Sequence, residues 1–364
     1  MYMEKYLRIL AINPGSTSTA IAIFEDNKLL EKETIRHSSQ ELSKYIKIFD
    51  QHKFREKIVI NFLRKKNIDI DSLDAIVGRG GVLKPVKSGA YRINKLMLED
   101  LKERPRIEHA SNLGAVIAYD LAQKTRTPSF IVDSVAVDEL EPIARISGMS
   151  DIERESLCHV LNLKAAARRM AQELGKFYEE LDLIVVHLGG GISVSAHSKG
   201  RMIDVNNAGT EGPFTPERTG ELPSVELVKL CYSQKYTLRE MLKKLIGKGG
   251  LVDYLGTNNL LEVEERIAKG DKKAELLYQA MAYQVAKEIA AMAAVLKGKV
   301  NAIVITGNGA RNKGALGNSF VDWIKERVNF IASVTVYPGT DEMKALVLGA
   351  IRVLKGEEKA LEYK

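Results

Sequence analysis

The sequence predicts an α/β protein whose two lobes repeat one pattern, a mixed β-sheet flanked by helices. Two segments half a chain apart read almost alike, residues 7–24 (LRILAINPGSTSTAIAIF) and residues 183–197 (LIVVHLGGGISVSAH). Each has an apolar run, a turn of glycine or small polar residues and a second apolar run, which is typical of a β-hairpin. Because a third strand and then alternating helices and strands follow both hairpins, we predict one mixed sheet in each lobe.

The first half of the chain supplies the elements of the first lobe. A turn at 26–28 leads from the hairpin into a strand over 29–37. Apolar residues three and four positions apart predict helices, and short apolar runs that end in glycine or aspartate predict buried strands. The expected helices cover residues 42–49, 57–65 and 111–124, and the expected strands cover residues 74–77 and 129–132.

The second half repeats this order of elements. It begins with a helix predicted over 155–174, which Gly175 stops, and after the hairpin a strand is expected over 201–205. Thr237 and Glu240 have the spacing of a capping box, which opens a short helix. The remaining expected elements are helices over 272–297, 320–330 and 343–354 and strands over 300–305 and 333–337.

Length and composition fit two domains. The 364 residues are 45% hydrophobic, enough for a substantial core in each lobe. The polar stretch 145–155 is the expected boundary, so we predict a first lobe of residues 1–150, completed by the C-terminal helix 343–364, and a second lobe of residues 151–342. No apolar run has the length of a membrane span, and the N-terminus does not read as a signal peptide. We therefore expect a cytoplasmic protein without membrane contact.

Charge and cysteine content narrow the classes of partner. Lys+Arg 54 against Asp+Glu 47 gives a formal net charge of +7, but the signs alternate along most of the chain. Such a modest positive balance suits an anionic small molecule better than a nucleic acid. The two cysteines form no metal-binding or redox spacing. We expect neither a nucleic-acid partner nor zinc chemistry.

The turn of the first hairpin carries many hydrogen-bonding groups. Residues 13–19 (NPGSTST) hold five hydrogen-bonding side chains, whereas a plain turn needs only a glycine or an asparagine. Hydroxyls, backbone N–H groups and the close approach that glycine allows all suit phosphate oxygens. The sequence therefore favours phosphate contact here over an ordinary turn.

Two glycine-rich turns in the second half suggest further nucleotide contacts. The three glycines at 189–191 follow a buried strand that His187 closes, whereas a tight hairpin needs only one or two. We expect an anionic ligand close to this backbone. The turn at 306–309 (TGNG) is compatible with a plain strand-to-helix turn or with a site, and no dinucleotide or Walker-type motif is present.

Four ionisable side chains stand beside turns or strand ends, and a fifth, a histidine, lies on the apolar face of a predicted helix. An arginine flanked by small residues can stabilise a phosphoryl group through its guanidinium fork, although isolated surface arginines are common. A carboxylate at a helix start is usually a cap, and it is also an oxygen ligand of the kind that Mg²⁺ prefers. A lone histidine on an apolar helix face is usually a core residue. The candidates are Arg79, Arg218, Asp133, Glu342 and His159.

In chain order, these motifs resemble the acetate and butyrate kinase family, within the larger group of sugar kinases, actin and heat-shock ATPases. The resemblance spans essentially the whole chain, and its segments are NPGSTST, GRGG, IVDSVAV, CHVLNLKAAARR, HLGGGISVSAH, GPFTPERTGELP, ITGNGARN and PGTDEMKAL. It implies a duplicated ribonuclease H-like (actin-like ATPase) fold, ATP or ADP and Mg²⁺ as cofactors, a small carboxylate as substrate and a homo-oligomer.

The resemblance also implies roles for the matched residues. Arg79 and Arg218 would hold the substrate carboxylate and the transferring phosphoryl group, to which His159 would donate. Asp133 and Glu342 would support Mg²⁺. The residues expected to contact ATP, the first of them also beside the metal, are Asn13, Gly15, Ser16, Thr17, Ser18, His187, Gly189, Gly190, Gly191, Gly307, Asn308, Gly309 and Arg311.

Three residues, Gly81, Cys158 and Pro216, are expected at the acyl pocket. The acetate kinases of the family carry a histidine next to the glycines after the arginine, and an aromatic residue before the histidine matched by His159. This chain has GRGG and Cys158 there. Smaller residues leave room for additional methylenes, each worth about 0.8 kcal/mol when buried. We therefore predict reversible in-line transfer from ATP to butyrate or a branched-chain analogue.

Rival functions stay open at this point. The first is an acetate or propionate kinase. A sugar or other hydroxyl kinase of the same fold would need a base at the hydroxyl, and Asp133 could serve. A rival of another class is a nucleotide-gated binding protein like the heat-shock ATPases, which carry an appended peptide-binding domain.

Overall fold

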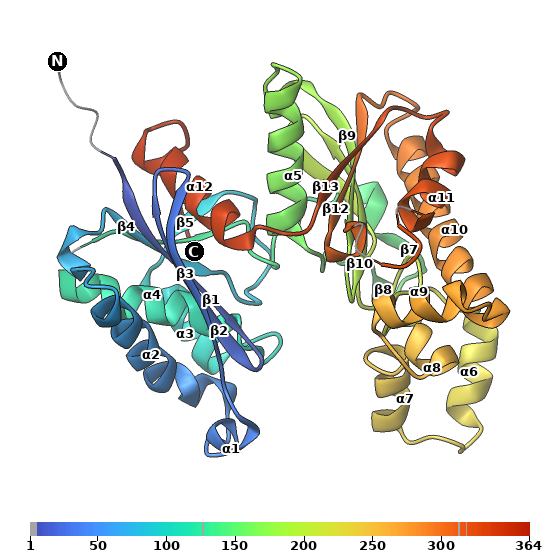
Figure 1. Cartoon of the computed structure of the whole chain (residues 1–364), viewed down its shortest axis with the longest axis horizontal. Coiled ribbons are helices and arrows are strands. Elements are labelled where there is room, and N and C mark those ends of the chain that lie inside the picture. Colours follow the sequence, from blue (N-terminus) through green and yellow to red (C-terminus); the bar gives the residue numbers. More distant parts are fainter. Residues whose placement is uncertain (1–5, 126, 312–313, 318) are drawn as a thin grey trace. The chain divides into compact units, whose positions relative to one another are not determined.

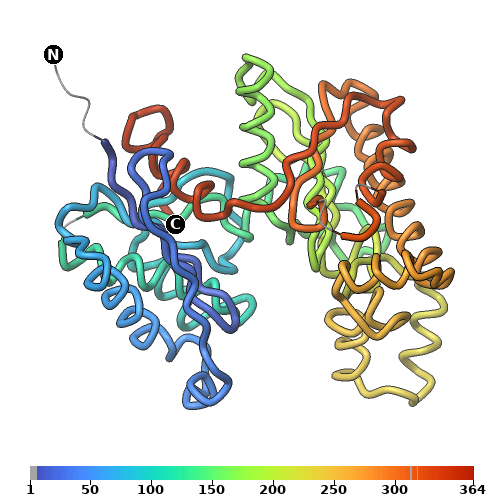
Figure 2. The backbone as a smooth tube through the Cα atoms, in the orientation of Figure 1, coloured from blue at the N-terminus to red at the C-terminus, as the bar shows by residue number. Residues whose placement is uncertain are grey.

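The computed structural model describes residues 6–125, 127–311, 314–317 and 319–364. It divides into two compact units, Met1–Val137 together with Asp341–Lys364, and Asp138–Thr340. Figures 1 and 2 show the red C-terminal segment returning to the unit that the blue N-terminal segment begins. The boundary predicted at residue 150 lies within the second of these units.

The first unit is built on a seven-stranded mixed sheet with the order β14-β5-β6-β4-β1-β2-β3. Its first three strands pair antiparallel, whereas β4 runs parallel to β1 and β6 parallel to β4. The strands are β1 (Arg8–Gly15), β2 (Ser18–Glu25), β3 (Lys28–Arg36), β4 (Ala75–Arg79), β5 (Ala90–Arg92), β6 (Ser129–Val132) and β14 (Leu361–Glu362). The helices are α1 (Ser39–Leu42), α2 (His52–Lys65), α3 (Lys95–Glu103), α4 (Asn112–Thr125) and α12 (Glu342–Leu354), with 3₁₀ turns at Ile48–Gln51 and Ile70–Ser72.

Helices cover both faces of this sheet. Leu10 and Ile12, which alternate along β1, pack in one cluster with Val59 of α2 and with apolar residues of α4. On the other face α12 packs across β1, β4 and β6 (Figure 1). Its Gly349 lies so close to Val132 that a Cβ there would be 2.4 Å from Val132 Cγ1. The core of the first unit is thus completed by a helix from the far end of the chain.

The second unit is built on a five-stranded mixed sheet with the order β11-β10-β9-β12-β13. Helix α5 covers one face, and α10, with α11 packed against it, covers the other (Figure 1). The strands are β9 (Asp182–Leu188), β10 (Ile192–Ser198), β11 (Arg201–Val205), β12 (Ala302–Gly307) and β13 (Val334–Pro338), with β7 (Ile146–Met149) and β8 (Ile152–Glu153) in a separate hairpin. The helices are α5 (Val160–Glu173), α6 (Ser224–Tyr232), α7 (Leu238–Leu245), α8 (Leu251–Leu255), α9 (Leu260–Ala268), α10 (Lys272–Val295) and α11 (Ser319–Val328), with 3₁₀ turns at Pro142–Arg145, Tyr178–Glu180 and Asn308–Ala310.

The two sheets share one topology. In the order β3-β2-β1-β4-β6 and in the order β11-β10-β9-β12-β13, three antiparallel strands are extended by two parallel ones. Long helices precede the two parallel strands in both units, α2 and α4 in the first and α10 and α11 in the second. The predicted duplication is therefore confirmed. Within the part of the chain that the structure describes, no helix has the length and apolar character needed to cross a membrane.

The helix predicted over 42–49 was wrong. The chain forms α1 before that segment because Ser38 and Glu41 make a capping box: the Ser38 side chain accepts from the backbone N–H of Glu41, and the Glu41 carboxylate accepts from that of Ser38. Only a 3₁₀ turn, Ile48–Gln51, falls at the end of the expected helix. A strong cap thus placed the helix start earlier than the apolar spacing indicated.

The helix predicted from residue 155 begins five positions later. β8 ends at Glu153, and α5 begins at Val160 with His159 as its N-cap residue. His159 therefore stands at the open start of a helix, where backbone N–H groups lack intrahelical partners, instead of on its apolar face. This position brings the ring to the end of the neighbouring strand β9.

Candidate active site

The tip of the first hairpin is only two residues long. Gly15 of β1 pairs with Ser18 of β2, so Ser16 and Thr17 alone form the turn, and both are exposed. Asn13 lies within β1 and not in the turn, because the antiparallel pairing continues to Gly15. The exposed turn and the Asn13 amide are thus separate parts of the predicted phosphate contact.

A buried arginine of α2 hydrogen-bonds to the backbone of this tip. Arg55 of α2 is fully buried, and its Nη1 donates to the carbonyl oxygens of Gly15 at 2.9 Å and Ser18 at 2.7 Å. Gln51 Oε1 accepts from Nε at 3.1 Å and from Nη2 at 2.9 Å. Desolvation lowers the pKa of Arg55 to about 10, so the guanidinium stays charged at neutral pH. The shape of the tip is therefore fixed by a cation outside the hairpin.

Replacing Arg55 with leucine is expected to lower the free energy of unfolding by about 3 kcal/mol, because the carbonyl oxygens of Gly15 and Ser18 lose their donor. Urea denaturation measures the loss. Arg64→Leu, at an exposed site of the same helix, should change the value by less than about 0.5 kcal/mol. Equal stability of Arg55→Leu and the unchanged protein would contradict the role of Arg55.

Three predicted site residues meet at the start of α12. Glu342 is the first residue of this helix, which Asp341 caps by accepting from the backbone N–H of Lys344 at 3.1 Å. Glu342 Oε2 accepts a hydrogen bond from Asn13 Nδ2 at 2.7 Å and forms an ion pair with Arg79 Nη1. The Arg79 and Glu342 side chains are 25% and 27% exposed, so small solutes can reach this polar cluster.

Arg79 is the last residue of β4, and close packing of α4 holds it in place. A Cβ on Gly78 would lie 2.1 Å from the carbonyl oxygen of Gly114, and a Cβ on Gly114 would lie 2.4 Å from that of Arg79. Only glycine at both positions lets the strand and the helix approach so closely. Sequence reasoning missed His109 nearby, whose pKa is lowered by desolvation and, to a smaller extent, by the charge of Arg79.

Asp133 and Gly81 lie in densely packed surroundings. Asp133, which follows β6, is 2% exposed, and its Oδ1 accepts from the backbone N–H of Gly89 at 2.8 Å. A Cβ on Gly81 would lie 2.4 Å from Asn112 Oδ1 at the start of α4. The missing side chain at Gly81 thus serves helix packing in this structure, and its part in an acyl pocket stays a prediction.

The second hairpin brings two histidines into contact. His187 is the next-to-last residue of β9, and its ring stacks on that of His159, with centroids 3.9 Å apart and an interplanar angle of 9°. His187 Nδ1 lies 2.6 Å from Asn162 Nδ2, and His159 Nδ1 lies 2.9 Å from Ser193 Oγ. A Cβ on Gly189 would lie 2.9 Å from His187 Nε2. The stacked pair therefore stands directly beside the glycine turn at 189–191.

Arg218 reaches the same turn from the loop after β11. A Cβ on Gly191 would lie 2.6 Å from Arg218 Nη1 and 3.1 Å from His159 Cε1, so the contact requires a glycine. Nη1 donates to the carbonyl oxygen of Ala208 at 2.6 Å. Nε of Arg218 is buried and has no acceptor among the described residues, and desolvation lowers the pKa of the guanidinium. A half-buried cation whose buried Nε donor is unused is suited to an anionic ligand.

The predicted pocket residues Cys158 and Pro216 are both buried. Cys158 Sγ lies 3.9 Å from Met202 Sδ, and burial raises the pKa of the thiol to about 12, so Cys158 is a neutral packing group. Pro216 lies in the loop after β11, where Thr215 Oγ1 donates to the carbonyl oxygen of Gly190 at 2.7 Å. That hydrogen bond joins the loop directly to the glycine turn.

The third glycine-rich turn packs against the second. Gly307 has a φ of +100°, and a Cβ on it would lie 2.1 Å from the carbonyl oxygen of Leu188. Gly307 and Gly339 exchange two backbone hydrogen bonds of 3.1 and 2.8 Å, and Arg311 lies against Gly339. Asn308 is exposed. Because β12 pairs parallel with β9, the residues predicted to contact ATP in this unit lie at the same end of these two neighbouring strands.

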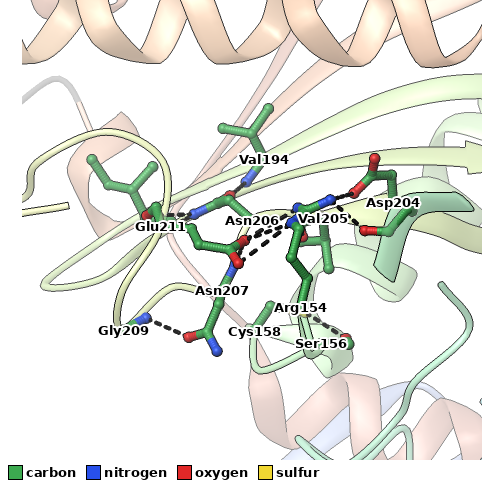
Figure 3. Close-up of polar contacts among 12 residues, drawn as sticks. Arg154, Ser156, Cys158, Val194, Asp204, Val205, Asn206, Asn207, Gly209 and Glu211 are labelled. Carbon is green, nitrogen blue, oxygen red and sulfur yellow. Dashed lines mark hydrogen bonds and ion pairs between the residues drawn. The ribbon is translucent and has the colours of Figure 1, made fainter. Parts of the chain in front are cut away.

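A charged cluster that sequence reasoning missed holds the loop after β11. Arg154 donates to Asp204 Oδ1 at 3.2 Å, to Glu211 Oε2 at 3.1 Å and to the carbonyl oxygen of Val205 at 3.1 Å (Figure 3). Glu211 Oε2 also accepts from the backbone N–H of Asn207 at 3.0 Å. The hydrogen bonds of Arg154 thus connect Glu211, in the loop, to Asp204 and Val205 at the end of β11.

The carboxyl group of Glu288, on α10, has a pKa raised to about 7. Desolvation is the largest cause, repulsion from Glu221, Asp204 and Glu211 adds to it, and Arg154 opposes it. The folded state therefore binds this proton more tightly than the unfolded chain, in which the group titrates near 4.5. The resulting stabilisation is fully present below the unfolded pKa and is lost as the pH rises through the folded pKa.

Glu288→Gln is therefore expected to raise the free energy of unfolding by about 1–2 kcal/mol at about pH 8 and to leave it unchanged near pH 4.5. Urea denaturation at the two pH values measures this difference. The exposed Glu326→Gln serves as the matched control and should show no such dependence on pH. An equal effect of Glu288→Gln at both pH values would exclude the raised pKa as its cause.

Comparisons with known proteins cover nearly the whole chain. The model of the acetokinase family matches residues 158–325. Butyrate kinase 1 of Clostridium acetobutylicum is 52% identical over 358 residues, which cover 98% of this chain and 99% of that protein. The crystal structure of Porphyromonas gingivalis acetate kinase aligns with a TM-score of 0.75 and 18% identity over 96% of this chain and 100% of that one. A propionate kinase from Francisella tularensis aligns with a TM-score of 0.71 and 18% identity over 94% and 98%.

These matches, taken with the duplicated sheet topology, define the class of the protein. It is a kinase with the actin-like ATPase fold, a phosphotransferase whose acceptor is a carboxyl group and whose nucleotide is ATP. More narrowly, the chain belongs to the acetokinase family.

Proposed function

We propose that this enzyme transfers the γ-phosphoryl group of ATP to the carboxylate of butyrate or a branched-chain analogue, reversibly, to give an acyl phosphate and ADP. The observation that carries the proposal is the half-buried Arg218, whose buried Nε has no acceptor among the described residues and which stands beside the glycine turn and the stacked histidines. A group of this kind favours a ligand whose negative charge develops at that point. The name of the clostridial relative supports a four-carbon acid over acetate.

The chemistry requires no general base. A carboxylic acid has a pKa near 4 and is already ionised at neutral pH. A carboxylate oxygen forms a bond to the γ-phosphorus while the bond from that phosphorus to the bridging oxygen breaks, and ADP leaves with the electron pair. The enzyme must therefore stabilise charge on the phosphoryl oxygens and offset the repulsion between two anions.

Several of the predicted residues have a part in that task. We assign the phosphoryl oxygens to the Arg218 guanidinium, with a hydrogen bond from His159, and the substrate carboxylate to Arg79. The backbone N–H groups of 189–191 and of the turn at 16–17 would hold further phosphate oxygens. The direct transfer leaves no role for a nucleophile of the protein, which fits the inert, buried thiol of Cys158.

We assign Mg²⁺ to the residues at the start of α12. Asn13 Nδ2 lies 2.7 Å from Glu342 Oε2, so the two side chains are neighbours, and the Glu342 carboxylate and the amide oxygen of Asn13 are ligands of the kind that this ion prefers. Asp133, a buried carboxylate, would support the same ion. When bound, the ion would neutralise charge on the ATP phosphates.

Trapping of the product with hydroxylamine tests the proposal. The enzyme is incubated with Mg-ATP and a series of acids from acetate to hexanoate, and the hydroxamate of each acyl phosphate is measured. We expect the highest kcat/KM with butyrate or a branched analogue. A preference for acetate or propionate would overturn the substrate, and ADP release with a sugar but with no acid would overturn the class of acceptor.

A homo-oligomer is part of the proposal. No residue of α6 is buried, and Val225, Val228 and Tyr232 are 62%, 55% and 85% exposed. Glu226 and Lys229 give this helix both signs of charge, so its face can meet a second copy of itself across a two-fold axis. We expect Val228→Glu to lower the mass measured by light scattering to that of a monomer, while Val228→Leu keeps the oligomer. A monomeric unchanged protein would contradict this part of the proposal.

A further inference from the structure

We propose that Asn162 is a positioning residue that fixes the ring proton of His187 on Nε2, the nitrogen nearest the glycine turn at 189–191. The inference rests on the proposed function, because it assigns the Nε2–H group to a phosphate oxygen of the nucleotide. It adds to that function a residue that touches neither ATP nor the acid.

The geometry of the start of α5 supports this role. Asn162 is the third residue of the helix, its backbone N–H donates to the carbonyl oxygen of His159 at 3.1 Å, and its side chain is held where it meets His187. The Asn162 Nδ2 to His187 Nδ1 distance is 2.6 Å, and the two residues are 7% and 6% exposed. Water therefore cannot readily replace the Asn162 amide as the hydrogen-bond partner of His187 Nδ1.

The chemistry of the two groups decides where the proton lies. A neutral imidazole has one donor nitrogen and one acceptor nitrogen. An amide N–H that donates to Nδ1 makes Nδ1 the acceptor, so the proton must be on Nε2. A carboxylate in the same place would act in the opposite sense, since it would draw the proton to Nδ1 and favour the doubly protonated, cationic ring.

The groups around His187 favour an uncharged imidazole ring. His187 stacks on His159 at 3.9 Å, and the charged Arg218 stands at the same glycine turn. The partner of His159 Nδ1 is likewise neutral, the Ser193 hydroxyl at 2.9 Å. One permanent cation together with neutral N–H donors supplies directed hydrogen bonds to the phosphate without adding further like charges to the stack.

Nuclear magnetic resonance of histidine-labelled enzyme reads the tautomer directly. The chain has 6 histidines, and a His187→Gln variant identifies the signals of His187 in long-range ¹H–¹⁵N spectra. We expect His187 to be protonated on Nε2 in the unchanged protein. Asn162→Asp has the same size but an acceptor in place of the donor, so we expect it to move the proton to Nδ1 and to lower kcat by about tenfold or more.

The kinetic pattern separates positioning from packing. KM for the acid should stay within about twofold in Asn162→Asp, because Asn162 does not touch the substrate. Asn329→Asp, the matched change at an exposed site after α11, should leave both constants and the tautomer unchanged. If Asn162 only fills space, Asn162→Asp will keep the full kcat even where the proton moves to Nδ1, and that result would overturn the inference, as would an unchanged protein whose His187 is not protonated on Nε2.

Failure of this inference is distinguishable from failure of the proposed function. The tautomer of the unchanged protein is measured without turnover, and it decides the inference even where Asn162→Asp does not fold. Formation of acyl phosphate by an enzyme whose His187 carries its proton on Nδ1 would overturn the role of Asn162 alone. Absence of any acyl phosphate would overturn the proposed function, and the assignment of Nε2–H to its phosphate with it.

Discussion

Replacing Arg218 with alanine is expected to lower kcat about a thousandfold while the fold stays intact. The guanidinium lies against Gly191 and close to His159, where it can stabilise the charge that spreads over the phosphoryl oxygens. This stabilisation is greatest in the transition state, so KM for ATP should change by less than about threefold. Initial rates of ADP release with butyrate give both constants, and near-ultraviolet circular dichroism checks the fold.

Two further variants sharpen this test. Arg218→Lys keeps the charge but loses the planar fork, so its kcat should fall between those of the unchanged protein and Arg218→Ala. Arg239→Ala removes an exposed arginine from α7 in the same unit and should leave kcat within about twofold. Turnover by Arg218→Ala at the rate of the unchanged enzyme would exclude the assigned role.

Glu342→Gln is expected to raise the Mg²⁺ concentration for half-maximal activity about tenfold or more. Glutamine keeps the size of the side chain and can still accept from Asn13 Nδ2, but it has no negative charge for a cation and cannot form the ion pair with Arg79. Initial rates over a series of Mg²⁺ concentrations at constant ATP measure the shift.

Glu357→Gln is the matched control for that titration. Glu357 is exposed just after α12, so its replacement removes the same charge from the same unit without touching Asn13 or Arg79. An unshifted Mg²⁺ curve for Glu342→Gln would remove Glu342 from the metal site. An equal shift in both variants would assign the effect to net charge alone.

The sequence was sufficient for those parts of the fold that depend on local patterns. Both hairpins and the long helix α10 could be predicted. The apolar residues that alternate along a strand, or recur every three or four positions along a helix, are close together in the sequence. β5 and β14 could not, since three and two residues are too few to show a period. The start of α5 was also misplaced, because apolar spacing alone does not reveal that β8 occupies the preceding residues.

The site was harder to predict because its contacts join distant parts of the chain. The hydrogen bond between Asn13 and Glu342 spans 329 positions, and only the family resemblance placed the two residues in one site. Arg55 was missed, although it occupies an apolar position of the α2 pattern shared with Val59 and Phe62. A charged residue on a buried helix face is a usable signal, because burial without partners would be costly.

Glycines were the least reliable guide to which residues contact a ligand. At Gly191 the missing side chain makes room for the Arg218 guanidinium, whereas at Gly81 it makes room for Asn112. A sequence records only that a side chain is absent, and not whether a ligand or a neighbouring helix uses the space. The predicted ligand contacts at the glycine turns and the predicted space at Gly81 therefore rested on the same kind of observation.

The return of residues 341–364 to the first unit has a consequence for biosynthesis. The ribosome completes residues 6–137 long before it makes α12, so the nascent first unit waits with one face of its sheet uncovered and without its β14 edge. The second unit is continuous in sequence and can close its own core meanwhile. The unit synthesised first is therefore the last to finish folding, and its exposed apolar strands are the part of the nascent chain that most needs protection from aggregation.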